Sequence, residues 1–347
     1  MCSPFPKFDC AACSRMHYGK YFFFLVAEEI YVFFSASTYR WKRLTDLLKN
    51  CGHTTFVPKR VNVTRWSGRF NALKALNLCC QDIKQALLEL SANDDEKMPV
   101  RCQANNLHEK MATLEFGIYV AFWFEVLERT DLASKSLQSA NMDLHTCSSL
   151  YSSLQHFYES LRDKCNLFEQ KGQLLSQQTE YSKEIRSRKR KLQFDEADTE
   201  QNLTPQNKIR TQVLYKTIDY LANNLKSRGK VYEDLSITFS VLFSLPLSED
   251  NVISDKASVL VNIYSNDLDT SLPSKCIQLK HFIMSLLAQV EYKNPTNHTK
   301  LLHKNNIIAT FPNVEIALRI FLSLMVTNAT GERSFSSLKR VKNYLRN

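Results

Sequence analysis

Apolar residues recur at three- and four-residue steps along most of the chain, which is typical of helices with one buried face. The aromatic-rich segment Tyr18 to Leu48 predicts a first amphipathic helix and then a second one capped by Ser37 or Thr38. A strand over Tyr31 to Phe34 is the alternative for part of it. The inner face of the first helix is predicted from Phe22, Val26, Ile30 and Phe33.

Helical spacing continues beyond this segment, and one stretch interrupts it. Phe56 to Trp66 alternates Val and Thr with polar residues and predicts a short core strand. From Arg69 to Asn93 the apolar steps predict a helix with Leu73 and Leu90 near the two ends of its buried face. Further helices are predicted at Leu107 to Thr130, Asp131 to Ser176, Ile209 to Leu225, His281 to Tyr292 and from Pro312 onward.

Composition supports a helical, globular protein. Only 7 Gly and 9 Pro occur in 347 residues, which is too few for many tight hairpin turns, and 44% of residues are hydrophobic. The nearest approach to a membrane span, Tyr21 to Ser35, contains Glu28 and Glu29. We therefore expect a mostly α, soluble chain with no membrane partner.

The net charge of +10 favours a polyanionic partner, because Lys and Arg that neutralise phosphates release counterions. The charge is densest in the run Arg186, Arg188, Lys189, Arg190 and Lys191, followed by acidic residues in a polar stretch that ends near Gln206. This run predicts a nuclear address or a phosphate contact. A solvated insertion without a partner is the third interpretation.

The ten cysteines are expected to be reduced thiols, because no secretory signal precedes them. Cys10 and Cys13 form one C-x-x-C pair, and His17 makes a zinc site conceivable, but the usual second pair is missing. No glycine-rich phosphate loop or nucleophile elbow occurs. We predict no metal, no other cofactor and no small-molecule substrate.

The C-terminal segment Ile307 to Asn347 carries the most specific pattern. Thr330 would cap a basic amphipathic helix in which Glu332 lies in the first turn, where the helix dipole favours a carboxylate. Apolar side chains form the inner face of this helix and of the helix before it. They are Leu318, Phe321, Leu322, Met325, Phe335, Leu338, Val341 and Leu345.

Residues Ala329 to Ser336 resemble the C-terminal dimerisation region of hAT-family transposases, with its Glu-Arg-x-Phe-Ser pattern, and the ending Asn343 to Arg346 looks like the branch that includes MYM-type zinc-finger proteins. Thr64 to Arg69 resembles the family's Thr-Arg-Trp motif. Two motifs in family order are more specific than either one alone.

The resemblance implies a partial RNase H-like α/β core interrupted by a helical insertion domain. The implied domains are residues 1–70 for the core remnant, 71–290 for the insertion and 291–347 for the dimerisation region. The resemblance implies that the apolar faces of that last region, from Leu318 to Leu345, form the dimerisation surface. It also implies that Arg65 and Trp66 lie near nucleic acid, with the indole stacking on an unpaired base. A tryptophan in the hydrophobic core is the alternative for Trp66.

The family cuts DNA with two aspartates and one glutamate that hold two divalent metal ions, and Glu332 matches that glutamate. The two aspartates of the pattern are not matched here, and a lone carboxylate does not hold two Mg²⁺ ions. The resemblance therefore implies that Glu332 is a relic, that no catalytic residue is active and that the chain is not an enzyme.

These observations lead to the hypothesis of a nuclear, transposase-derived protein that acts through dimerisation, with itself or with a related hAT-type protein, and that associates with nucleic acid. An active metal-dependent transposase or nuclease is one alternative, and it would require Mg²⁺ and two further acids converging on Glu332. A DNA-binding module without chemistry is the other alternative, supported by the charge and by Trp66.

Overall fold

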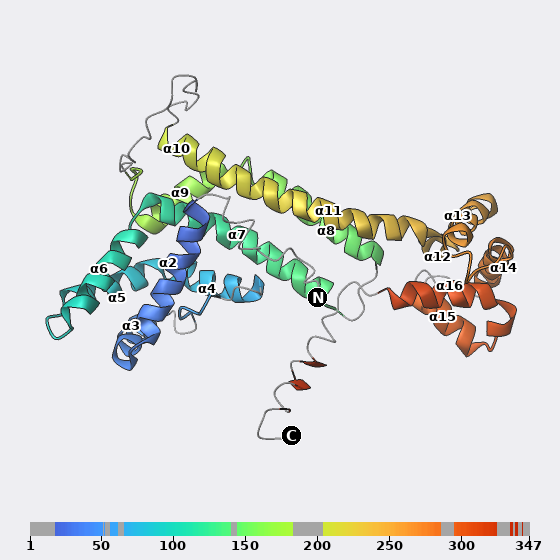
Figure 1. Cartoon of the computed structure of the whole chain (residues 1–347), viewed down its shortest axis with the longest axis horizontal. Helices are drawn as coiled ribbons and strands as arrows, with labels where there is room; N and C mark the ends of the chain where they lie inside the picture. The colour runs from blue at the N-terminus through green and yellow to red at the C-terminus, as the bar shows by residue number, and fades with distance from the viewer. Residues whose placement is uncertain are drawn as a thin grey trace, which may run out of the picture. The chain divides into compact units, whose positions relative to one another are not determined.

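The computed structural model describes residues 18–50, 52, 56–61, 66–139, 144–182, 204–285, 295–324, 334–335, 337–338 and 342. Within these residues all regular elements are helices, so the predicted mostly α class is confirmed (Figure 1). The implied RNase H-like α/β core is not supported, because the described residues contain no strand. None of the described helices is long and apolar enough to cross a membrane.

The described chain folds into two compact units. The N-terminal unit lies within Phe5–Ser136 and Ser153–Leu225, and the C-terminal unit lies within Leu137–Ser152 and Lys226–Asn347. These units divide the chain at positions other than the domain boundaries implied at residues 70 and 290. Three of the boundaries between the units fall inside helices, which are α7, Leu114–Leu137, α8, Leu144–Ser160, and α11, Lys216–Thr238.

Aromatic side chains fill the core of the N-terminal unit. Phe23 of α2, Tyr18–Ser35, has its ring centroid 5.5 Å from that of Phe116 in α7, Leu114–Leu137. The ring centroid of Phe122 in α7 lies 5.5 Å from that of Phe168 in α9, Cys165–Ser176. Buried rings of this size remove large apolar areas from water and stabilise the helix packing. The unit also contains α3 Thr38–Asn50, α4 Trp66–Leu78, α5 Cys80–Ala92, α6 Met98–Met111 and α10 Pro205–Lys208.

The two predicted N-terminal helices are confirmed. The backbone N–H of Arg40 donates a hydrogen bond to Ser37 Oγ at 3.5 Å, so Ser37 caps α3 as expected. The strand predicted as an alternative over Tyr31 to Phe34 is wrong, because these residues belong to α2, where the apolar steps of three and four bury Phe33 and Phe34.

The short strand predicted over Phe56 to Trp66 is wrong for its described part. Residues 56–61 run without regular structure, and Trp66 begins α4. Val61 donates its backbone N–H to Glu28 of α2 at 2.8 Å, so a side chain satisfies a backbone group that a neighbouring strand would otherwise pair.

The stretch predicted as a single helical region from Asp131 to Ser176 is divided. Turns at residues 161–164 separate α8 from α9, and α9 ends where Gln177 adopts a left-handed conformation with φ of 60°. Ser176, the last residue of α9, accepts a hydrogen bond from the N–H of Gln178 through its Oγ. Periodicity alone does not register such breaks, because the apolar stripe continues across them.

The predicted helix over Ile209 to Leu225 is confirmed, with one irregularity. Its first part, Ile209–Tyr215, is a π-helix, and α11 follows directly from Lys216. Ile218, Leu221 and Leu225 are buried as expected. A π-helical turn adds a residue to the helix and changes which side chains share a face.

In the C-terminal unit a mainly aliphatic cluster, which also contains Phe239, Phe311 and Phe321, joins five helices. They are α12 Ser240–Ser244, α13 Asp250–Ile263, α14 Leu272–Ser285, α15 Pro295–Lys304 and α16 Pro312–Ser323, and the 3-10 turn Ile308–Thr310 lies beside this cluster. Helix α15 packs against α16, and α13 packs against α14 (Figure 1). The predicted start of a helix at Pro312 is confirmed.

Candidate functional site

Trp66 lies in the core of the N-terminal unit and has 7% of its surface exposed. The guanidinium carbon of Arg69 lies 6.0 Å from the Trp66 ring centroid and 5.5 Å from that of Phe24. Stacking on a base requires an accessible ring face, and this indole face is covered. The core interpretation of Trp66 is therefore the one that its burial supports, and Arg65 lies outside the described residues.

The basic run Arg186 to Lys191 also lies outside the described residues, which include Ser182 before it and Thr204 after it. Tyr181 Oη donates to the Glu169 carboxylate at 2.6 Å, and Gln206 Nε2 donates to the same carboxylate at 2.7 and 2.9 Å. Arg210 of the π-helix adds a bond at 2.8 Å. One acid of α9 therefore holds both chain segments that flank residues 183–203.

A second acid holds the first of these flanking segments. The backbone N–H of Ser182 donates to Glu115 Oε1 at 2.7 Å, and its hydroxyl donates to Glu115 Oε2 at 2.9 Å. The polar stretch predicted to continue to Gln206 ends earlier, because Pro205–Lys208 forms the helix α10, capped by Thr204. The sequence did not identify Glu115 and Glu169 as important, because their partners are 67 and at least 12 residues away.

The hydrogen bonds at Glu169 determine its protonation. Burial would raise the pKa of this carboxyl, but the bonds from Tyr181, Gln206 and Arg210 outweigh burial and hold the pKa below its usual value. Burial and the bond to Glu169 raise the pKa of the Tyr181 hydroxyl. Near neutral pH, Glu169 is therefore an anion that accepts from three neighbours.

The residues predicted for dimerisation fall into three groups. Leu318 and Phe321 are 0% and 5% exposed, because the chain's own aliphatic cluster covers them. Leu322 is 42% exposed, Phe335 66% and Leu338 48%. Met325, Val341, Leu345 and the relic Glu332 lie outside the described residues.

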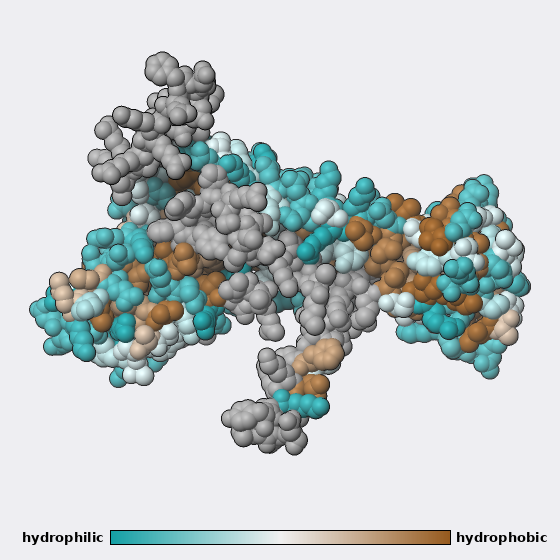
Figure 2. Space-filling model, in the orientation of Figure 1, coloured by the Kyte–Doolittle hydropathy of each residue, from teal (hydrophilic) through white to brown (hydrophobic). Residues whose placement is uncertain are grey.

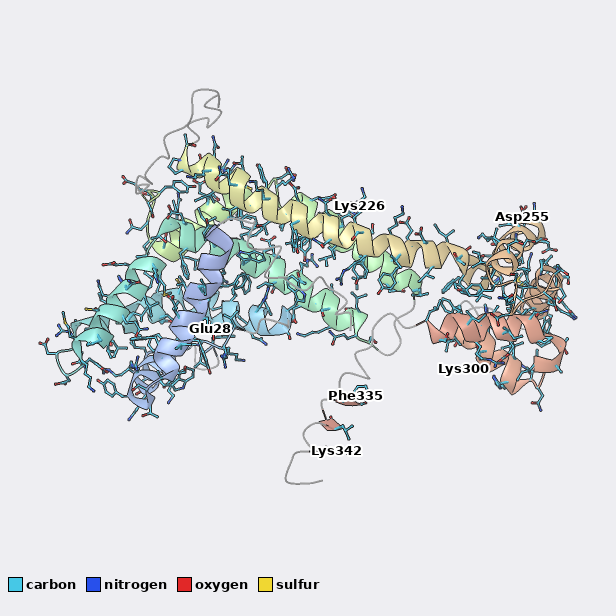
Figure 3. All side chains as sticks on the ribbon, in the orientation of Figure 1. Glu28, Lys226, Asp255, Lys300, Phe335 and Lys342 are labelled. Carbon is cyan, nitrogen blue, oxygen red and sulfur yellow. The ribbon has the colours of Figure 1, made fainter. Side chains whose placement is uncertain are left out.

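Phe335 and Leu338 are three residues apart, and both lie at helical positions. The backbone N–H of Lys342 donates a hydrogen bond to the Leu338 carbonyl at 2.7 Å. Figure 3 labels Phe335 and Lys342 in this segment. Two large apolar side chains thus share one exposed helical face.

A groove of about 740 Å³ runs along α7 in the N-terminal unit, and the sequence did not predict it. The residues of α7 that line the groove follow one another at alternating steps of three and one positions along the helix. The other lining residues come from α4, α8, α9 and the turn before α9. The lining residues are Asn77, Ala121, Phe124, Glu125, Glu128, Arg129, Leu132, Phe157, Lys164, Lys171, Leu174 and Leu175. An apolar stripe in the sequence does not reveal which of its members face a groove, so no sequence signal distinguished Leu132 and Leu174 from core leucines.

The charges in this groove are unevenly paired. Glu125 accepts from Lys164 Nζ at 2.8 Å and lies 3.8 Å from Lys171 Nζ. The Arg129 guanidinium lies 5.2 Å from the centre of the Phe157 ring, and Lys164 Nζ lies 5.5 Å from it. Three cations and two carboxylates line the groove, which leaves a surplus of one positive charge.

Among the described residues no group of three His, Cys, Asp or Glu side chains is placed to hold a metal ion. Cys10, Cys13 and His17, the conceivable zinc ligands, lie outside that part of the chain. Of the described thiols, burial raises the pKa of Cys80 to about 11 and that of Cys276 to about 12. These two cysteines behave as small core residues.

Comparisons of the chain with protein-family models, with curated proteins and with solved structures find no match.

Proposed function

We propose that this chain is a non-catalytic, transposase-derived protein that acts by self-association through the exposed face of Phe335 and Leu338. One observation carries the proposal: two large apolar side chains, 66% and 48% exposed, lie one helical turn apart within the segment that resembles a known dimerisation region. Leu322, near the end of α16, is a further exposed apolar side chain, at 42%.

The energetics fit a modest, reversible dimer. Burying one large apolar side chain stabilises a complex by about 1.5–3 kcal/mol, and a symmetric contact buries each side chain twice. Association costs several kcal/mol of translational and rotational freedom, which offsets part of this gain. A related hAT-type chain with the same motif is the other partner that this surface suits.

The resemblance of Glu332 to a catalytic residue does not make the chain an enzyme in this proposal, because the pattern's two aspartates are not matched. The proposal also does not use an RNase H-like core. The proposal includes a nuclear location and association with nucleic acid, because the net charge is +10 and the run Arg186 to Lys191 is basic.

Light scattering over a concentration series tests the proposal. We expect the wild-type chain to reach at least twice the 40.2 kDa of one chain, and the double variant Phe335→Glu/Leu338→Glu to have a lower average mass than the wild type at every concentration. Both side chains are exposed, so the charges act on association rather than on folding. Equal circular dichroism of the two chains confirms that the fold is kept.

The matched control is Leu88→Glu/Met98→Glu, which places two charges on exposed apolar positions of the N-terminal unit, 44% and 68% exposed. It should dimerise like the wild type. A wild-type chain that is monomeric at all concentrations, or a control that dissociates as readily as the C-terminal variant, would overturn the proposal.

A further inference from the structure

We propose that the groove along α7 is a docking site for helix α13 of a second copy of this chain. The inference rests on the proposed self-association but uses a different surface. Two leucines that line the groove are exposed, Leu132 at 54% and Leu174 at 77%. Phe124 and Phe157, which also line it, are half-buried. Exposed leucines beside partly covered rings are typical of a surface that binds another apolar face.

Helix α13 presents such a face. Val252, Val259 and Ile263 are 38%, 52% and 55% exposed, while Ile253, Ala257 and Leu260 of the same helix are buried in the aliphatic cluster. Figure 2 shows hydrophobic surface over the helices α12 to α14. The exposed residues are seven and four positions apart, so they form a second apolar stripe on an otherwise ordinary amphipathic helix.

The two surfaces match in length. The α7 stripe runs from Ala121 to Leu132, and the α13 stripe runs from Val252 to Ile263. Each covers eleven residue steps, or about 16 Å of helix. A three-turn helix that lays its apolar stripe in a groove of equal length is an established mode of recognition.

The charges match as well. The exposed acid Asp255 lies on α13 between Val252 and Val259 (Figure 3), and the groove carries one surplus positive charge. Lys171, 3.8 Å from a carboxylate that already accepts from Lys164, can turn toward a second anion. The one cation of α13, Lys256, is half-buried and donates to Ser244 of its own unit at 3.4 Å.

This contact joins two different surfaces, so each copy contributes one helix and one groove. Such a contact is heterologous, and it either closes into a ring or continues into an open chain of subunits. It has a property that a symmetric contact lacks: a copy with a damaged helix can still accept an intact helix, and a copy with a damaged groove can still donate one.

The experiment uses this property. In the Phe335→Glu/Leu338→Glu background, which removes the contact of the proposed function, Val259→Glu damages the helix and Leu174→Glu damages the groove. Sedimentation velocity over a concentration series measures the background chain, each variant alone and the equimolar mixture of the two. The matched control is Leu88→Glu in the same background.

We expect the background chain and the control to associate with rising concentration. Each variant alone should weaken association at least about tenfold, since a charge at the centre of an apolar contact costs more than about 1.4 kcal/mol. The mixture should form a species of twice the single-chain mass and no larger one, because only one productive contact is possible per pair.

A background chain that stays monomeric overturns the inference, even if the wild type dimerises through Phe335 and Leu338. The same holds if either variant associates as well as the background chain, or if the mixture gains nothing over its components. Conversely, a background chain with the same mass as the wild type refutes the C-terminal contact and leaves the groove contact intact.

Discussion

Gly117 of α7 and Gly172 of α9 lie so close that a Cβ built on Gly117 would be 2.4 Å from the carbonyl oxygen of Gly172. A Cβ on Gly172 would likewise lie 2.7 Å from the backbone nitrogen of Ile118. The two helices therefore cross with backbone against backbone, and only glycine fits at either position.

Gly172→Ala should destabilise the protein although alanine is the better helix former. The added methyl group meets backbone that cannot move aside, which costs about 1–3 kcal/mol. We expect a lower denaturant midpoint, measured by circular dichroism. The control is Gly229→Ala in α11, where the new Cβ would make ordinary contact with Tyr151 at 3.4 Å. It should be neutral or stabilising by up to about 1 kcal/mol, and equal midpoints for the two variants would contradict the close crossing.

Glu169→Gln should loosen both segments that flank residues 183–203. The neutral amide cannot accept equally well from Tyr181, Gln206 and Arg210, so hydrogen exchange should accelerate on both sides together. The control is Glu159→Gln, an exposed acid of α8 whose carboxylate accepts only from Gln155 in the described chain. Acceleration on one side alone would contradict a shared anchor.

The same carboxylate should make stability depend on pH. Because the folded-state pKa of Glu169 lies below its usual value, its stabilisation is complete above the unfolded pKa of about 4.3 and is lost as the pH falls through the lower folded pKa. Denaturant midpoints measured from neutral to acidic pH should fall less steeply for Glu169→Gln than for the wild type. Parallel curves would show that the acid contributes nothing.

The basic run should bind double-stranded DNA in a salt-dependent manner. Replacing Arg186, Arg188, Lys189, Arg190 and Lys191 by Gln should weaken binding in fluorescence anisotropy and reduce the slope of log K against log salt by about 0.9 for each phosphate that the run neutralises. A control with five exposed cations replaced elsewhere tests the contribution of net charge alone: Lys42, Arg43, Lys59, Lys97 and Lys304. Equal weakening in both would refute a specific role for the run.

Cysteine reactivity should separate Cys102 from Cys80 and Cys276. Cys102 is exposed, whereas burial raises the pKa of the other two thiols to about 11 and about 12, so almost no thiolate forms on them near neutral pH. Iodoacetamide followed by peptide mass spectrometry should show Cys102 modified before Cys80 and Cys276. Rapid modification of Cys276 in the native chain would contradict the packing of α14.

The sequence predicted most helices because their apolar residues recur at the helical period, as at Leu73, Ile83 and Leu90, all of which are buried. It missed where helices break. Helices break at Cys79, between α4 and α5, and at the turns 161–164, between α8 and α9. The apolar stripe continues across both breaks, and hydrophobic periodicity detects only the stripe.

The candidate surfaces were predicted less well, because they depend on pairings distant in the chain. Phe321 and Phe335 look alike as apolar helix positions, yet Phe321 is covered by Phe239 and Phe243 while Phe335 is exposed. Trp66 was ambiguous for the same reason, and its covered ring became evident only once Arg69 and Phe24 were placed. The α7 groove is lined by residues of four helices that are distant in the chain, so no local sequence pattern predicted it.

The π-helical turn Ile209–Tyr215 determines how this chain tolerates a change in length. A π-helical turn holds one more residue than an α-helical turn, so deleting one residue there would give an ordinary α-helix and leave the following residues in phase. Ile218, Leu221 and Leu225 would still face the core. The same deletion within α11 would rotate everything that follows by about 100° about the helix axis, so a single-codon deletion should be tolerated better in the π-helical turn than in the regular helix.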